Sequence, residues 1–581
     1  MVIAAPSPYY LQNFERALAW LTQRYEDLFD TAERTFIAEF ARLPPHSRAL
    51  LVRMLMRKGI QGTQGTLFRT SRLVYEEIGC SLQAAAPLAS LGWVDLDPLL
   101  TIEDFFSLST RPELVRVFPD IAKKSTRKAD WLDALRIAHE KAQRYTDWDG
   151  SARERVLRVT VGALTDRLRL MFFGNLHQDW SEFVLADLGV FNYETVSIAP
   201  SARAFRERRD VDAWLALHAC REALDALADD ASIAPLFAAT NTIAIDNEWL
   251  ETRRAKLLFQ IGYRAEQQRD WDAALNVYAL CKWPEARYRH LRVLERCARF
   301  DEAFALASDA AAEPENEVES QRIARMLPRL MRRLRLEAPR AATTPPPVAR
   351  DTLTLRKSAE PFAVEYAVRD HLHAVHAPVY YVENALINSL FGLLFWEPVF
   401  APVPGAFFHP FQRGPADLLA PDFYARRADQ FAHYLAQLDS DAYRETIRRH
   451  FHGKAGLQSP FVFWGALTSE LLDLALECLP ATHLKLWFIR LLDDIRENRS
   501  GLPDLIRFWP REGRYELIEV KGPGDRLQDN QIRWLQYCAL HGMPVRVVDV
   551  RWEHDASGDS VIVNETSTAS LRATQAPEPT A

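Results

Sequence analysis

The stretch "SGLPDLIRFWPREGRYELIEVKGPGDRLQDNQIRWL", residues 500–535, decides the fold class of the C-terminal part of the chain. It contains two short apolar runs, residues 504–509 and 515–521, joined by a connection of hairpin length, and such runs predict two neighbouring strands. A segment with helical periodicity follows at 527–542, and a third strand candidate lies at 544–552. Because helices precede these strands, the order predicts a mixed α/β domain.

Two carboxylates and a lysine are expected to meet at one edge of this sheet. Fourteen residues separate Asp504 from Glu519, and the hairpin lets their strands lie side by side. Glu519 and Lys521 project to the same side, because side chains alternate along a strand. Carboxylate oxygens suit Mg²⁺ or Mn²⁺. With Lys521 beside the water or phosphate that the metal holds, the pattern predicts metal-assisted phosphodiester hydrolysis.

Each of these acidic residues also has a plainer interpretation. A Glu-x-Lys pair occurs on solvent-facing strands, where it contributes about 1 kcal/mol or less. The strand here is otherwise apolar and follows a Gly-Leu-Pro-Asp turn, which favours a functional site. Glu383 lies in the apolar run 379–396, which we predict to be one buried helix. A buried glutamate needs a metal or a base, and a solvent-facing place at the helix start is the alternative.

The segments before residue 340 have mainly helical periodicity. Residues 253–311 contain two units of helix, short charged turn and Ala-rich helix, which is typical of tetratricopeptide-like repeats. A solenoid of this kind is usually a scaffold or binding surface and by itself indicates no enzyme. Three consecutive prolines within 337–352 predict a linker and the main domain boundary, since no helix or central strand accepts them.

Length, charge and cysteine content limit the classes of protein to which the chain can belong. At 581 residues the chain is too long for one hydrophobic core and predicts several domains. Its net charge of −7 means that any nucleic-acid binding depends on local basic patches. No apolar run is long enough to span a membrane, and no signal peptide is recognisable. The six cysteines form no CxxC pair, so we expect a reduced, cytoplasmic setting without a zinc ribbon.

The motifs resemble the VRR-NUC branch of the PD-(D/E)XK nucleases. The resemblance rests on "GLPDL", on "LIEVKGPGDRL" and on Gln531 followed by "WL". It points to the Fanconi anaemia-associated nucleases and their bacterial relatives. Segments 50–79, 382–400 and 411–419 and the 253–311 repeats are also similar to that family, so the resemblance covers most of the chain.

This resemblance implies a DNA nuclease that selects branched or flapped DNA. It implies 5′-flap endonuclease and 5′-to-3′ exonuclease activity, with a part in unhooking interstrand crosslinks, and Mg²⁺ or Mn²⁺ as the cofactor. Lys521 corresponds to the catalytic lysine, and Gln531 to a helix glutamine near the phosphate. The implied metal ligands are Asp504, Glu519, Glu383 and the backbone carbonyl of Val520.

The resemblance also implies an architecture: a mostly α-helical N-terminal part, followed by an α/β nuclease domain of the restriction-endonuclease type. The expected parts are an N-terminal helical domain (1–75), a SAP-like DNA-binding region (76–160), tetratricopeptide-like helical repeats (161–340), a Pro-rich linker (341–352), the VRR-NUC nuclease domain (353–555) and a disordered tail (556–581).

Eukaryotic members begin with a ubiquitin-binding zinc finger, whereas this N-terminus has no cysteine cluster. We therefore expect a bacterial-type protein that acts at the nucleoid and contacts DNA phosphates through its basic, SAP-like stretches. A solvated helix face is the alternative for each stretch. The candidates, chosen by charge clustering, are Arg53, Arg57, Lys58, Arg69, Lys123, Lys124, Arg127 and Lys128.

Several other polar residues are expected to have structural places. Three histidines fit no usual metal-ligand spacing, one tryptophan is expected to pack rather than to stack on bases, and three acids lie in family-like segments without an assigned role. These residues are His371, His373, His376, Trp534, Glu365, Glu397 and Asp417.

Two other functions stay open. One is a nuclease for a different junction, such as a Holliday-junction resolvase or a restriction-type endonuclease, although such enzymes are usually small dimers. The other is a tetratricopeptide scaffold whose nuclease-like domain is inactive. That scaffold predicts a broken acid set, whereas Asp504, Glu519 and Lys521 are all present.

Overall fold

The computed structural model describes residues 8–62, 64–120, 127–151, 153–182, 191–197, 199–337, 346–356 and 363–553. The chain divides into two compact units, each built from two separate segments. The first unit comprises Met1–Thr344 and Asn384–Ser500, and the second comprises Pro345–Glu383 and Gly501–Ala581. The second unit is therefore interrupted in the sequence by a long insertion.

The first unit begins with a helical module that carries a small antiparallel sheet in the order β1-β2-β4-β3. Asp30 accepts the Glu33 N–H at 2.8 Å, and this capping box fixes the start of α2. The elements are α1 (Tyr9–Tyr25), α2 (Thr31–Arg42), α3 (Pro45–Met56), α4 (Ser81–Ser90), α9 (Gly162–Phe173), β1 (Ile60–Gly62), β2 (Gly65–Arg69), β3 (Val94–Asp95) and β4 (Val156–Val159).

The described helices between β3 and β4 share a core with Leu67 of β2 and Val156 of β4. Phe105 and Trp148 stack with ring centroids 5.5 Å apart, and Trp131 is buried beside them. Thr101 and Thr110 each form a capping box, which explains why two helices follow so closely. The elements are α5 (Ile102–Leu108), α6 (Arg111–Val117), α7 (Lys128–Ala138) and α8 (Tyr145–Trp148).

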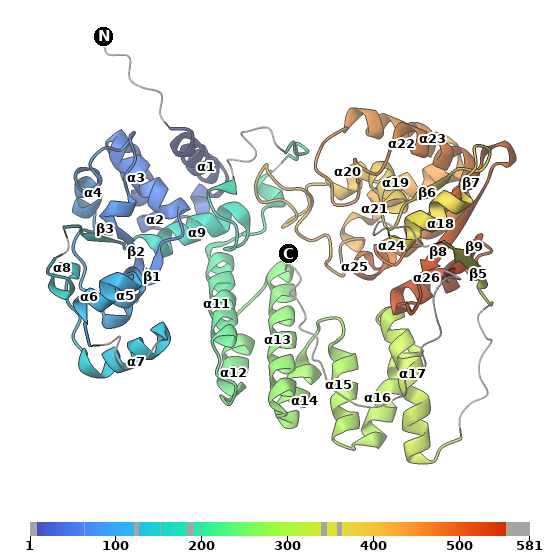
Figure 1. The fold of residues 1–581 in the computed structure, drawn as a ribbon, viewed down its shortest axis with the longest axis horizontal. Helices are drawn as coiled ribbons and strands as arrows, with labels where there is room; N and C mark the ends of the chain where they lie inside the picture. The colour runs from blue at the N-terminus through green and yellow to red at the C-terminus, as the bar shows by residue number, and fades with distance from the viewer. Residues whose placement is uncertain are drawn as a thin grey trace, which may run out of the picture. The chain divides into compact units, whose positions relative to one another are not determined.

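A row of antiparallel helices forms the middle of the chain, side by side in Figure 1. Small residues let neighbouring helices approach closely. A side chain at Gly262 of α13, for example, would meet the ring of Tyr278 on α14. Alanines 303, 307 and 310 are fully buried in the same core. The elements are α11 (Arg208–Asp225), α12 (Ala234–Thr242), α13 (Glu248–Gln268), α14 (Trp271–Leu280), α15 (Ala286–Arg296), α16 (Phe300–Ala312) and α17 (Glu317–Leu334).

The insertion is helical and belongs to the same unit as the N-terminal helices. Lys454 Nζ lies 2.7 Å from Glu194 Oε2, and the Trp396 indole donates to that carboxylate at 2.6 Å. The Phe408 ring packs against Trp249. The elements are α19 (Leu386–Leu394), α20 (Trp396–Val399), α21 (Ala428–Leu435), α22 (Ala442–Gly453), α23 (Ser469–Cys478), α24 (Ala481–Asp493) and α25 (Ile495–Asn498).

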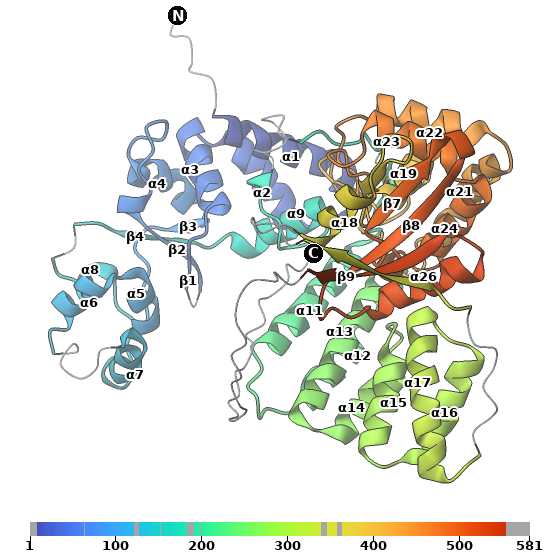
Figure 2. The same cartoon turned by 45° about the vertical axis from the view of Figure 1, so that its right-hand side comes forward.

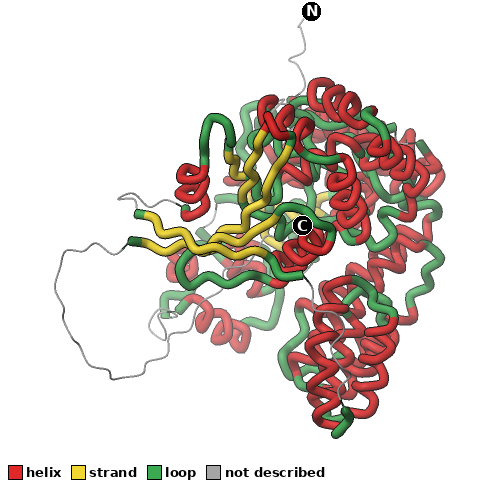
Figure 3. The backbone as a smooth tube through the Cα atoms, turned by 90° about the vertical axis from the view of Figure 1, so that its right-hand side faces the viewer, coloured by secondary structure: helices red, strands yellow, loops and turns green. Residues whose placement is uncertain are grey.

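The second unit is built on a mixed sheet, whose described strands run in the order β5-β9-β8-β7-β6 (Figures 2 and 3). β7 is antiparallel to β6 and β8, whereas β9 is parallel to β8 and β5. The elements are β5 (Ala349–Leu355), α18 (Val364–Leu372), β6 (Val379–Tyr381), β7 (Leu505–Trp509), β8 (Arg514–Lys521), α26 (Asp529–Leu540) and β9 (Val545–Trp552).

The predicted strand, strand, helix, strand order is confirmed by β7, β8, α26 and β9. One face of the sheet packs against Val368 of α18 through Leu505, Ile518 and Val548. Since side chains alternate along β8, Glu519 and Lys521 point away from this packed face.

Two sequence predictions need correction. The run 379–396 is not one helix, because its first three residues form β6 and α19 begins only at Leu386. The expected linker 341–352 ends earlier, because residues from Ala349 onward form β5. Parallel pairing with β9 supplies the hydrogen bonds of that strand, and the isolated sequence gives no sign of this partner. The expected tail, 556–581, lies outside the described residues, and the other domain limits stay predictions.

No helix in the described parts of the chain is long and apolar enough to cross a membrane.

Candidate active site

The β7–β8 hairpin places two carboxylates opposite each other. The strands pair from Trp509 with Arg514 to Leu505 with Ile518, so the next residues out are Asp504 and Glu519. Asp504 Oδ2 accepts the Val520 backbone N–H at 2.8 Å. Asp504 is 6% exposed and Glu519 is 0% exposed. The hairpin therefore brings these two acids together, as the sequence predicts.

Lys521 supplies one positive charge to this pair. Its Nζ lies 2.7 Å from Glu519 Oε1, which follows from their spacing of two along β8. Neither oxygen of Glu519 accepts a well-aligned hydrogen bond from the described residues. Burying a carboxylate without such bonds costs free energy. A further positive charge beside Glu519 would therefore stabilise the ionised pair.

Burial is the main reason why the pKa values of Asp504 and Glu519 are raised. Burial raises the pKa of Asp504, and the Val520 N–H and the Lys521 charge oppose that rise. Burial also raises the pKa of Glu519, and the nearby Asp504 charge adds to the effect while Lys521 opposes it. Because a carboxylate is harder to ionise when buried beside another acid, a divalent cation would stabilise the ionised pair.

Glu383 lies in a different place from the one expected. It occupies an exposed turn between β6 and α19, not a buried helix, because the strand β6 ends two residues before it. The Tyr381 hydroxyl donates a hydrogen bond to Glu383 Oε2. The Glu383 charge contributes to raising the pKa of both buried acids, so it lies within electrostatic reach of them. Tyr381 is a residue that the sequence analysis missed.

The donor set suits a hard divalent cation that keeps water or phosphate oxygens. Among the residues that the structure describes, no three His, Cys, Asp or Glu side chains form a metal-binding cluster by themselves. Mg²⁺ usually takes only one or two protein carboxylates and completes its shell with other oxygens. Asp504 and Glu519 therefore fit such an ion, with the Val520 carbonyl as a further oxygen from the same strand.

Gln531 and Trp534 lie on α26. The Gln531 side chain accepts the Gln528 backbone N–H at 2.9 Å and so caps the helix, which leaves its role at a phosphate a prediction. Trp534 is 1% exposed and packs against Tyr537, so the packing that the sequence predicts is confirmed.

The turn before Asp504 depends on one glycine. Gly501 has φ +87°, and a Cβ there would meet the Asn530 side chain at 2.8 Å and its backbone carbon at 2.9 Å. Asn530 belongs to the first turn of α26. Gly501 therefore lets the Gly-Leu-Pro-Asp turn lie close against this helix, which fixes where Asp504 enters the sheet.

The basic candidates for DNA contact differ in their surroundings. Arg69 is 9% exposed; its Nη2 lies 2.7 Å from Glu113 Oε1, and it also pairs with Glu154. These bonds raise the pKa of Arg69 and lower that of Glu113 to about 2, so this guanidinium stabilises its own domain. Arg53 is paired with Glu77 at 2.9 Å.

Some of the remaining candidates lie within the described residues and some lie outside them. Arg57 donates to the Arg72 carbonyl at 2.5 Å, and Lys58 and Arg127 are exposed. Lys123 and Lys124 lie outside the described residues, as does the Lys128 side chain. The contacts of all these residues with DNA stay predictions.

The supporting residues have structural partners. Asp417 is buried and accepts hydrogen bonds from Arg427 at 2.8 and 2.9 Å. Glu397 lies 3.2 Å from the His450 ring nitrogen Nε2. His373 Nδ1 accepts the Val379 N–H at 3.2 Å, which agrees with a structural place for this histidine. Glu365 on α18 adds negative charge near Asp504.

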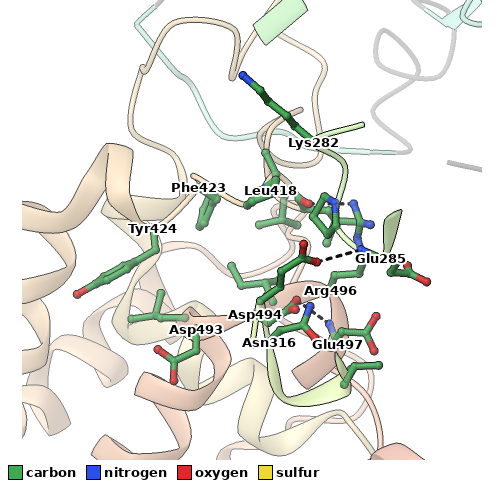
Figure 4. A pocket seen from close by; sticks show the side chains of 18 residues that line it. Lys282, Glu285, Asn316, Leu418, Phe423, Tyr424, Asp493, Asp494, Arg496 and Glu497 are labelled. Atoms are coloured by element: carbon green, nitrogen blue, oxygen red, sulfur yellow. Dashed lines mark hydrogen bonds between the residues drawn. The ribbon is translucent and has the colours of Figure 1, made fainter. Parts of the chain in front are cut away.

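A cavity of about 350 Å³ lies elsewhere, within the first unit (Figure 4). Its walls combine the apolar loop 418–423 with acids such as Asp493 and Asp494. The Arg496 guanidinium donates to the Leu419 carbonyl at 3.1 Å and lies 4.9 Å from the centre of the Trp283 ring. The expected metal-binding acids do not line this cavity.

Comparison with known proteins adds independent information. Three family models match: the VRR-NUC domain over residues 438–552, the "FAN1, HTH domain" over 8–95 and the "Fanconi anemia-associated nuclease SAP domain" over 99–148. Arg53, Arg57, Lys58 and Arg69 thus fall in the HTH match, outside the SAP match.

Relatives and solved structures cover nearly the whole chain. A Fanconi-associated nuclease 1 homolog from Pseudomonas aeruginosa is 51% identical over 95% of this chain and 97% of its own length. A homolog from Oryza sativa is 25% identical over 93% of this chain and 62% of its own length. The crystal structure of paFAN1 bound to DNA with a 2-nt 5′ flap and a gap has a TM-score of 0.86 and 50% identity, covering 96% of this chain and 100% of that one.

Replacing Gly501 tests the turn that positions Asp504. We expect Gly501→Ala to lower the free energy of unfolding by more than the roughly 1–2 kcal/mol that a left-handed alanine costs, because Asn530 must also move. Gly513→Ala is the matched control, since Gly513 has φ +59° and open space around its Cβ position. Thermal unfolding of both variants measures the difference. Equal losses of stability would contradict the close approach to α26.

Replacing Glu519 tests the cost of its burial. The pKa of Glu519 is raised by folding, so its stabilising contribution is present below the unfolded pKa and is lost as pH rises through the folded one. In EDTA, Glu519→Gln should therefore raise the free energy of unfolding by roughly 1–3 kcal/mol at pH 8 and by little at pH 5. Denaturant unfolding at both pH values measures this. A gain of the same size at pH 5 would show that the charge is not the cause.

Proposed function

The chain belongs to the Fanconi-associated nuclease 1 family and is a structure-specific DNA nuclease, and we propose that it cuts branched DNA at a 5′ flap with Mg²⁺ or Mn²⁺ as its cofactor. The observation that carries the proposal is the buried Asp504–Glu519 pair with Lys521 as its neighbouring cation. We propose that Asp504, Glu519, Glu383 and the Val520 carbonyl hold the metal. The flap preference is proposed because the similar paFAN1 chain is bound to 5′-flap DNA.

Lys521 and Asp504 have different roles in the proposed reaction. When bound, a divalent cation supplies charge neutralisation at the phosphate and acidifies a water molecule. Lys521 has its ammonium beside the carboxylates, where it can donate hydrogen bonds to the attacking water or to the phosphate as negative charge develops. Asp504 is held in place by the Val520 N–H, so its second oxygen can face a ligand without a change of backbone.

Gln531 is proposed to exchange its capping hydrogen bond for a contact with the DNA backbone. Its side chain caps α26 in the structure, so contact with a phosphate would exchange that hydrogen bond for one to DNA. A helix N-terminus favours an anion, which makes the first turn of α26 a suitable place for a phosphate oxygen. We propose that Gln531 acts there on the DNA backbone and not on the metal.

The biological role follows from the same family membership. We propose that the protein is also a 5′-to-3′ exonuclease and takes part in unhooking interstrand crosslinks, at the nucleoid of a bacterial cell. A Holliday-junction resolvase or a restriction-type enzyme is less well supported, because the relatives carry the same long helical part and the paFAN1 structures hold flapped DNA. An inactive scaffold would be expected to lack one of these acids, whereas Asp504 and Glu519 are both present.

Cleavage of labelled DNA tests this function. With Mn²⁺ or Mg²⁺ the protein should cut a 5′-flap substrate near the junction, faster than single-stranded, duplex, 3′-flap or four-way-junction DNA, and EDTA should abolish cutting. Asp504→Ala should lower the rate on the order of 100-fold or more, because it removes a carboxylate of the proposed cation site.

The matched control for that experiment is Glu512→Ala, which removes an exposed carboxylate from the other end of the same hairpin. This variant should cut at the wild-type rate. Preferred cutting of the four-way junction would favour the resolvase instead, and DNA binding without cutting in either metal would favour the scaffold.

A further inference from the structure

Glu383 is the one exposed carboxylate among the proposed metal ligands. Asp504 and Glu519 are fixed by the paired strands β7 and β8, whereas Glu383 sits in an exposed turn. The next residue, Asn384, has φ +52°, so the chain reverses sharply there. An exposed carboxylate loses side-chain conformational freedom when it binds a cation, so a hydrogen bond that orients it beforehand strengthens binding.

Tyr381 supplies that restraint. Its hydroxyl donates a hydrogen bond to Glu383 Oε2, and its ring centroid lies 5.1 Å from that of Tyr366 on α18. Tyr381 pairs with Leu505 across β6 and β7, so its backbone is fixed to the strand that carries Asp504 at its start. A strand residue thus holds the carboxylate of the exposed turn that follows it.

We propose that Tyr381 is a positioning residue: its hydroxyl binds one oxygen of Glu383 so that the other faces the cation shared with Asp504 and Glu519. This inference rests on the proposed metal role of Glu383. A phenol is protonated at neutral pH, so Tyr381 remains a donor to the carboxylate. Hydrogen bonds to ligating carboxylates orient them, and loss of such a bond typically weakens metal binding 10–100-fold.

Tyr381→Phe isolates the hydroxyl, since phenylalanine keeps the ring that packs on Tyr366. Calorimetric titration with Mn²⁺ should give a dissociation constant about 10-fold or more above that of the wild type. Cleavage of 5′-flap DNA should need correspondingly more Mn²⁺ and should approach the wild-type rate at saturating metal. The thermal unfolding temperature in EDTA should stay unchanged, because no packing is lost.

The matched control is Tyr380→Phe on the same strand, which also removes a hydroxyl but whose ring lies near Phe508 and not near Tyr366. That variant should bind Mn²⁺ as the wild type does. Unchanged Mn²⁺ affinity in Tyr381→Phe, or a rate that stays low at saturating Mn²⁺, would overturn the positioning role. If Asp504→Ala also left Mn²⁺ binding unchanged, the proposed metal site itself would be wrong, so the two failures are distinguishable.

A second inference concerns α17, whose charges are segregated along its length. Its acids, Glu317 and Glu319, lie in the first turn, and every charged residue after them is an arginine. Ile323, Met326 and Leu330 form the buried face. The exposed arginines on the outer face are Arg325, Arg329, Arg332 and Arg333.

These arginines form a stripe of positive charge on the last helix of the row. Positions 325, 329 and 332 follow the spacing of one helix face and span about 10 Å along its axis. Arg329 lies 3.1 Å from Glu295, with half of its side chain exposed, and so exposed a pair is easily exchanged for another partner. Arg332 Nε donates to the Pro328 carbonyl at 3.2 Å and keeps its other donors.

We infer that this stripe contacts the phosphate backbone of a duplex arm of the DNA substrate. Duplex DNA carries one negative charge per roughly 1.7 Å of its axis, so a stripe of this length meets several phosphates. Arginine is suited to phosphate because its planar donors can bind two oxygens at once. An acidic protein surface is the competing partner, and the experiment separates the two.

The test replaces Arg325, Arg329 and Arg332 with glutamine. The control replaces three other exposed arginines of the same helical row that lie outside α17: Arg209, Arg221 and Arg299. Binding of uncleaved 5′-flap DNA in Ca²⁺ is measured between 50 and 200 mM salt. The slope of log affinity against log salt should become shallower by about 2–3 in the α17 variant and not in the control.

At saturating enzyme the α17 variant should cut the 5′-flap substrate at the wild-type rate, because it keeps Asp504, Glu519 and Lys521, and this result separates the inference from the proposed nuclease function. Equal salt slopes for the two variants would overturn the DNA contact and would leave an acidic protein as the partner to test.

Discussion

The central constraint on this molecule is the burial of two carboxylates at one end of a strand pair. Asp504 and Glu519 are almost wholly excluded from solvent, and Lys521 is the cation held against them. Burial raises the pKa of both acids, which shows that the fold opposes their ionised forms. A protein tolerates such a cost where function requires it, and a divalent cation bound to the pair would relieve it. The Gly501 turn, the β7–β8 register and the first turn of α26 all support this pair.

The second unit assembles the site from segments that lie far apart in the sequence. β6 and Glu383 come before the helical insertion, whereas β7, β8 and α26 come after it. Pairing of β6 with β7 therefore brings Tyr381 and Glu383 to the strand that Asp504 begins. The insertion itself packs with the N-terminal part of the first unit through contacts such as that of Lys454 with Glu194, a loop residue. The sheet of the second unit is therefore formed by residues from both sides of the insertion.

The charges of the helical part are of two kinds. Arg69 and Arg427 are buried and bound by carboxylates, so they stabilise their own domains. The α17 arginines are exposed, on a helix whose acids are confined to its first turn. A cluster in the sequence does not reveal this difference, because both kinds consist of arginines among apolar residues. Burial separates a structural cation from one that can meet a phosphate.

The amino-acid sequence by itself determined the hairpin, the placing of Asp504 opposite Glu519 and the shared side of Glu519 and Lys521. These depend on local rules: the period of two along a strand and the length of a turn. Only the tertiary structure decided that residues 349–355 form a strand, that residues 379–381 form another, and that Glu383 lies in a turn beside Tyr381. The reason is physical. A three-residue strand and an edge strand owe their conformation to hydrogen bonds with distant partners, and no local periodicity encodes those partners.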